Sequence, residues 1–145
     1  MKKNIRIYLS VVVVIFTIAC KKSNSQSDNS FTLGAATYPG ITFIKSSNEI
    51  HYSSGSDAGV SFIFNGTLPS TSGTFTTGTS SQRVRILATV SNKDYSDTYK
   101  TNGSYTVTVS GVKLKIDGQA PVWLYNVNSP STDSVKFSCN NLEGN

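Results

Sequence analysis

The feature that most constrains this chain is a two-residue alternation of apolar and polar side chains that recurs from position 31 to the C-terminus. Residues 84–90, 104–109 and 112–117 show it most clearly, with Arg, Thr or Lys between most of the apolar positions and Leu87 as an exception. A period of two places alternate side chains on opposite faces of a strand, so these segments are predicted to be half-buried β-strands. No stretch of eleven residues in this part has the apolar spacing of an amphipathic helix.

Turn-forming residues divide the pattern into short pieces. Ser110-Gly111 lies between two alternating segments and predicts a tight hairpin, because glycine adopts the positive φ that such turns require. Asn65-Gly66 predicts a second turn, and Asp117-Gly118 is predicted to end the second strand of the hairpin. Further strands are expected at residues 41–44, 49–52, 60–64, 122–127 and 135–137.

Eight or nine short strands about ten residues apart are typical of an antiparallel all-β domain. We predict a β-sandwich, immunoglobulin-like or similar, with a small β-barrel as the alternative. A parallel sheet is not expected, because its crossover connections need helices. With 145 residues the chain is too short for two sizeable cores, so residues 31–145 are predicted to form a single domain.

The net charge of +5 does not indicate a nucleic-acid-binding protein. Residues 31–145 carry eight basic and seven acidic side chains, and the remaining basic residues lie near the N-terminus. Nucleic-acid binding requires several phosphate contacts clustered on one surface. We therefore expect no nucleic-acid partner.

The first twenty residues, MKKNIRIYLSVVVVIFTIAC, have the organisation of a secretory signal. A cationic start precedes an apolar run over residues 7–19. As a helix this run would span roughly 20 Å, less than the ~30 Å hydrocarbon core of a membrane. The segment therefore indicates export rather than a permanent membrane span.

Thr17-Ile18-Ala19-Cys20 resembles the lipobox of bacterial lipoproteins, with Thr17 where that family most often has Leu. The resemblance implies that residues 1–19 are a cleaved signal peptide and that Cys20 carries fatty acyl chains such as palmitate. Two or three chains anchor a protein stably, because each buried methylene contributes about 0.8 kcal/mol. The short polar segment at residues 20–30 then holds the lipidated cysteine and a flexible tether.

Residues close to Cys20 indicate which membrane is expected. Lys21 and Lys22 stand where enteric lipoproteins retained in the inner membrane have Asp, which favours the outer membrane. The leader and the strand pattern resemble the small uncharacterised β-sandwich lipoproteins of Bacteroidetes. Their surface-export signal is an acidic cluster, and only Asp28 is present here, so the periplasmic side is favoured over the cell surface.

Trp123 and Tyr125 are the candidate ligand-binding residues. Their i, i+2 spacing places both rings on one face of a strand, where neighbouring aromatic rings can stack on sugars. Filling a core is the commoner role of such a pair, and this alternative stays open. Separately, Asp133-Ser134-Val135 resembles the acceptor for O-glycosylation in Bacteroidetes envelope proteins, which makes Ser134 a candidate modification site.

No catalytic residue, cofactor or metal site is predicted. His51 is the single histidine, and its strand pattern directs it away from the face of its neighbours. Asp94 and Asp97 would hold Ca²⁺ if they lay in one loop, but a solvated turn explains them equally well. With Cys20 lipidated, Cys139 is expected to be a buried thiol without a disulfide partner.

These observations favour a non-enzymatic binding or adhesion module for a glycan or a protein, anchored to the membrane through its N-terminal lipid. The alternative is a structural or accessory subunit of an envelope complex that pairs through an edge strand. A hydrolase, or a hydrolase inhibitor that uses the Ser/Thr/Gly-rich segment 69–82 as a loop, is less expected.

Overall fold

The computed structural model describes residues 29–55, 57–78, 83–97 and 103–144. This part of the chain is built from strands and contains no helix, and every pairing between strands is antiparallel. The predicted all-β antiparallel class is therefore confirmed. The strands are β1 (Ser30–Leu33), β2 (Ala36–Pro39), β3 (Thr42–Lys45), β4 (Glu49–Ser53), β5 (Ala58–Phe64), β6 (Gly73–Thr76), β7 (Val84–Val90), β8 (Lys93–Ser96), β9 (Ser104–Ser110), β10 (Lys113–Asn126) and β11 (Ser134–Gly144).

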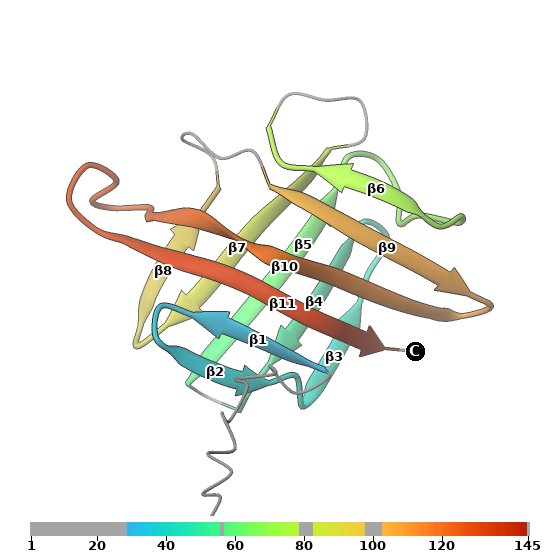
Figure 1. Cartoon of the computed structure of the whole chain (residues 1–145), viewed down its shortest axis with the longest axis horizontal. Coiled ribbons are helices and arrows are strands. Elements are labelled where there is room, and N and C mark those ends of the chain that lie inside the picture. Colours follow the sequence, from blue (N-terminus) through green and yellow to red (C-terminus); the bar gives the residue numbers. More distant parts are fainter. Residues whose placement is uncertain (1–28, 56, 79–82, 98–102, 145) are drawn as a thin grey trace, which may run out of the picture.

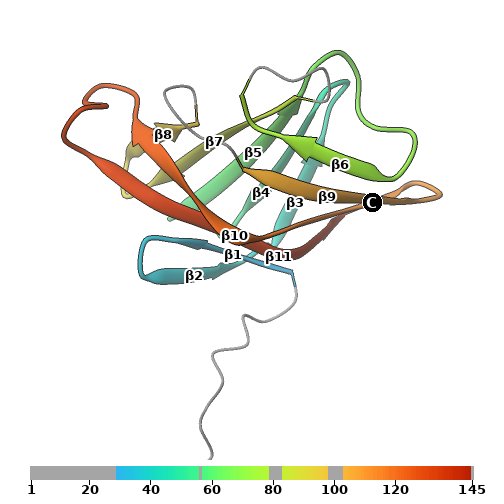
Figure 2. The same cartoon turned by 45° about the horizontal axis from the view of Figure 1, so that its top comes forward.

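The strands form one sheet in the order β2-β1-β11-β10-β8-β7-β5-β4-β3, and β9 and β6 extend it from β10. Strands β1, β9, β10 and β11 cross over β4, β5 and β7, so the sheet folds back on itself (Figures 1 and 2). Because hydrogen bonds link all eleven strands, the immunoglobulin-like sandwich of two separate sheets is not confirmed.

The long strand β10 joins the two layers. Its first half, Lys113–Asp117, pairs with β9, whereas Tyr125 and Asn126 pair with β8. The prediction that Asp117-Gly118 ends a strand is wrong, because β10 continues through it with register shifts on both sides of Gly118. A Cβ atom on Gly118 would lie 2.3 Å from the ring of Tyr105, so glycine lets this ring pack against the bent strand.

The hairpin predicted at Ser110-Gly111 is present. Residues 110 and 113 pair across a two-residue turn in which Gly111 has φ 62°. A second two-residue turn joins β7 to β8, and both of its residues, Ser91 and Asn92, have positive φ. That combination is characteristic of a type I′ turn, whose twist suits paired antiparallel strands.

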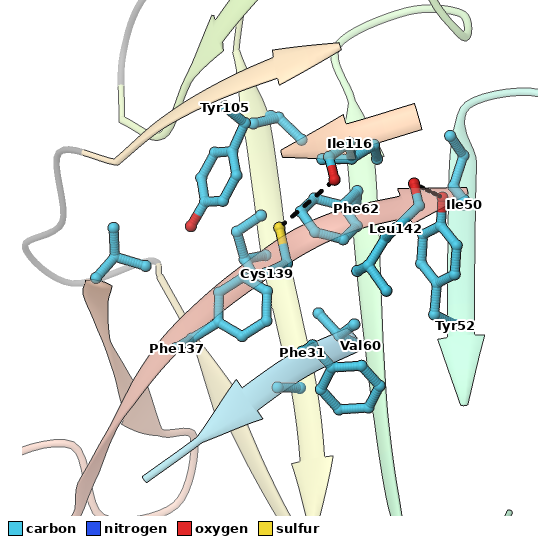
Figure 3. Packing of buried hydrophobic residues seen from close by; sticks show 14 of the residues in the cluster. Phe31, Ile50, Tyr52, Val60, Phe62, Tyr105, Ile116, Phe137, Cys139 and Leu142 are labelled. Atoms are coloured by element: carbon cyan, nitrogen blue, oxygen red, sulfur yellow. Dashed lines mark hydrogen bonds between the residues drawn. The ribbon is translucent and has the colours of Figure 1, made fainter. Parts of the chain in front are cut away.

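The core lies between the two layers and is rich in aromatic rings (Figure 3). The ring of Phe62 on β5 contacts three others, with centroids 6.2 Å from Tyr52, 5.6 Å from Tyr105 and 5.9 Å from Phe137. Cys139 is fully buried among them, as predicted, and burial raises the pKa of its thiol. All buried hydrophobic residues described lie between positions 31 and 142, so a chain that begins at residue 21 keeps this core.

Residues 1–28 lie outside the described part, and the predicted signal peptide, Cys20 and most of the tether fall there. In the described residues no helix has the length and hydropathy needed to cross a membrane.

Candidate functional site

The outer face of the sheet carries a row of mostly polar side chains. Directly paired residues of antiparallel strands point to the same face, so the register shows which side chains are neighbours. His51 of β4 pairs with Ser61 of β5, and Ser61 pairs with Leu87 of β7. Leu87 pairs with Ser96 of β8, and Ser96 pairs with Tyr125 of β10. Five strands thus place one residue each in a single row.

A groove of about 580 Å³ runs along this face. Most of its lining comes from outward positions of β4, β5, β7 and β8, and most of the lining side chains are polar. The lining residues are His51, Gly59, Ser61, Arg85, Leu87, Ala88, Thr89, Asp94, Tyr95, Ser96 and Val127.

Hydrogen bonds orient the polar groups of the groove. Nδ1 of His51 lies 2.9 Å from Oγ of Ser61, and the hydroxyl of Thr89 donates to Oδ1 of Asp94 over 2.7 Å. Gly59 makes room for the histidine, because a Cβ atom there would lie 2.9 Å from Cε1 of His51. The groove therefore offers an imidazole, hydroxyls, a carboxylate and the guanidinium of Arg85 to one ligand.

Trp123 and Tyr125 lie on this outer face. Trp123 is 44% exposed, and the ammonium of Lys136 sits 5.1 Å from the centroid of its ring. The alternating residues Val122 and Leu124 are buried instead. The core interpretation is therefore wrong for Trp123. Tyr125 is half-buried beside the groove residue Ser96, so this member of the predicted aromatic pair adjoins the groove.

Ser134 is exposed at the start of β11 and lies directly opposite Tyr125. The preceding carboxylate, that of Asp133, accepts hydrogen bonds from Lys93 at 2.9 Å, from Asn126 at 3.2 Å and from Tyr95 at 3.3 Å. The hydrogen bond from Lys93 is the main cause that lowers the pKa of Asp133. Glycosylation of Ser134 stays a prediction, and a sugar there would lie beside Tyr125.

The carboxylates that suggested a Ca²⁺ loop do not converge. Asp94 lies on β8 and is exposed, whereas Asp97 follows the strand and is buried. Asp97 accepts a hydrogen bond from the backbone N–H of Ile86 at 3.1 Å, and burial raises its pKa. Within the described ranges no group of three or more His, Cys, Asp or Glu side chains could hold a metal ion.

His51 and Ser61 have the spacing of a nucleophile and its base, but a Ser-His mechanism also needs a group that orients the imidazole. Among the described residues, the imidazole of His51 hydrogen-bonds with the hydroxyl of Ser61. The hydrogen bond joins two side chains that both line the groove.

The sequence did not reveal the groove, because its lining comes from positions between 51 and 127 that strand pairing brings together. The alternation of residues 84–90 correctly placed Arg85 and Thr89 on the face of the strand that points away from the core. It did not indicate that β5 and β8 lie on either side of that strand.

No protein-family model, curated protein or solved structure matches this chain. The geometry of the groove is therefore the basis for a functional proposal.

Proposed function

We propose that this chain is a lipid-anchored outer-membrane protein, facing the periplasm, that binds a glycan without catalysing a reaction. The observation that carries the proposal is the groove on the outer face of β4, β5, β7 and β8, with Tyr125 beside it. The lipid anchor at Cys20 and the membrane location rest on the resemblance of residues 17–20 to a lipobox.

The lining of the groove suits a sugar. Its volume of about 580 Å³ falls within the roughly 300–1,000 Å³ of small-molecule sites. Ser61, Thr89 and Asp94 supply donors and acceptors for sugar hydroxyls, and Leu87 supplies an apolar surface for ring C–H groups. The ring of Tyr125 adds an aromatic surface at the edge of the groove.

An accessory subunit that pairs through an edge strand is the second candidate. It is favoured by Ile41 and Ile44, which are 71% and 59% exposed at edge strand β3. The described edge strands β2, β3 and β6 are only four residues long, β2 ends in Pro39 and β3 ends in Lys45. Short edges with proline or lysine oppose pairing with another chain, so the glycan-binding function is preferred.

Polysaccharide pull-downs and a glycan array with residues 21–145 test the proposal. Leu87→Glu places a charge in the middle of the groove, and Val112→Glu makes the same kind of change at a 74% exposed turn position away from it. Circular dichroism verifies that both variants fold. We expect binding by the wild type and by Val112→Glu, and its loss in Leu87→Glu.

Trp123→Ala and Tyr125→Ala refine the location of the ligand. Loss of binding in folded Tyr125→Ala, with a smaller loss in Trp123→Ala, is expected because Tyr125 adjoins Ser96 and Lys136 covers part of the Trp123 ring. A folded wild type that binds no glycan would contradict the proposed function. Labelling of cells with a palmitate analogue, abolished in Cys20→Ser, tests the anchor separately.

A further inference from the structure

The outer face carries a second, smaller cavity that adjoins the groove. It measures about 210 Å³ and is lined by Asn48, Ile63, Phe64, Asn65, Gly66, Arg83 and Arg85. Arg85 lines both cavities, so the two adjoin at this side chain.

The two arginines lie side by side for a structural reason. Val84 and Ile86 of β7 are buried, so Arg83 and Arg85 take the alternate positions and point to the outer face. Ile63 pairs with Arg85 and also lines the cavity. Nε of Arg83 is buried and has no hydrogen-bond partner among the residues that the structure describes.

The charged side chains that line this end of the groove are basic. Of the described residues that line the smaller cavity, only the two arginines are charged. Asp97 is buried and interacts electrostatically with both arginines. Glu49 lies in the same row as Arg85, two strands away, because it pairs with Ile63. Neither Asp97 nor Glu49 lines the cavity, so among the described residues the two guanidinium groups are the charged groups that a ligand in it would contact, which favours an anion.

We propose that the groove binds an acidic glycan and that Arg83 and Arg85 hold its anionic substituent, a carboxylate or a sulfate. This inference rests on the proposed glycan-binding function. A guanidinium presents paired N–H donors that match two oxygens of one anion, and the amides of Asn48 and Asn65 add neutral donors. The sugar ring carrying the anion would lie in the groove, among its hydroxyl groups.

The test compares matched polymers. Isothermal titration of residues 21–145 with polygalacturonate and with its carboxyl-reduced form isolates the carboxylate, and chondroitin sulfate against desulfated chondroitin isolates the sulfate. We expect at least one acidic polymer to bind about tenfold more tightly than its neutral counterpart, because the anion adds one or two charge-assisted hydrogen bonds. The difference should shrink in high salt.

Variants locate the effect. Arg85→Gln is expected to lower affinity for the acidic polymer about tenfold while affinity for the neutral form stays unchanged. Arg85→Lys keeps the positive charge but lacks the planar guanidinium. Its affinity for the acidic polymer should lie between that of the wild type and that of Arg85→Gln. Lys115→Gln removes the same charge from β10, where it lines neither cavity, and should leave both affinities unchanged.

Four results would overturn the inference. Equal binding of the acidic and neutral forms excludes the anion pocket but leaves the proposed function intact. Equal losses in Arg85→Gln and Lys115→Gln, or equal binding of single-stranded DNA, would indicate nonspecific attraction of polyanions. A folded wild type that binds no polymer of either kind would contradict the proposed function as well.

Discussion

The two faces of β4, β5 and β7 differ sharply although they belong to the same strands. Inward positions such as Tyr52, Phe62 and Ile86 are fully buried and form the core. The intervening outward positions, among them His51 and Ser61, line the groove. The inner residues fill the aromatic core, whereas outward residues such as His51 and Leu87 are only partly buried. Binding chemistry can therefore be placed on the outer face at little expense in stability.

The largest difference between the two faces is expected in the free energy of unfolding when neighbouring residues of β5 are replaced by alanine. Phe62→Ala should lower the free energy of unfolding by about 3–5 kcal/mol, because Phe62 is fully buried at the centre of the aromatic core. Ser61→Ala, one position away, should lower it by only about 1 kcal/mol through loss of the bond to His51. Urea unfolding measures both, and equal values would show that the outer face is also part of the core.

The bend in β10 provides a second test of the inner face. Gly118→Ala should destabilise the protein by about 1–3 kcal/mol, because the new Cβ atom would overlap the ring of Tyr105. Gly73→Ala is the matched control, since the nearest atom to a Cβ there is 3.8 Å away. Thermal unfolding should separate the two variants, and similar midpoints would mean that Tyr105 does not pack closely on Gly118.

A substitution on the outer face should affect binding more than stability. In Gly59→Ala the imidazole of His51 must move, because the new Cβ atom would lie 2.9 Å from its Cε1. We expect a severalfold loss of glycan affinity with a change of only a few degrees in the unfolding midpoint. Affinity equal to that of the wild type would place the ligand away from His51.

The smallest effects on stability are expected from a change of pH. The ionisation of Asp133 and that of Asp97 should change stability in opposite directions. The lowered pKa of Asp133 means that its stabilising contribution is present above its ordinary pKa and is lost as pH falls through the lowered value. Burial raises the pKa of Asp97, so stability should instead decrease as pH rises from the ordinary value through the raised one.

Melting curves between pH 2 and 7 measure this difference. Asp133→Asn should reduce the loss of stability in acid, whereas Asp97→Asn should reduce the loss on the neutral side. Identical pH profiles for the two variants would show that the two carboxylates do not differ in environment.

Alternation predicted the strands whose two faces differ most. Residues 84–90 alternate except at Leu87 and form β7, and the alternating residues 104–109 lie in β9. Alternation does not indicate β8, because Lys93–Ser96 contains a single apolar residue, Tyr95. Asp117-Gly118 resembles a turn locally, but packing of Tyr105 against Gly118 holds it inside a continuous bent strand.

The candidate site was predictable only in part. Spacing indicated that Trp123 and Tyr125 share a face, but not whether that face was inside or outside. The groove depends on the strand order β4-β5-β7-β8, which sequence-local patterns do not encode. His51 and Ser61 therefore became neighbours only through pairing between β4 and β5.

The claim that the groove on the outer face binds a glycan is tested most directly by backbone amide NMR. Residues 21–145, labelled with ¹⁵N, are titrated with the tightest-binding glycan. We predict that chemical-shift changes cluster on the outward positions of β4, β5, β7 and β8, including Ser61, Leu87 and Ser96. Changes confined to edge strands β2 and β3, or no changes with any glycan, would contradict it.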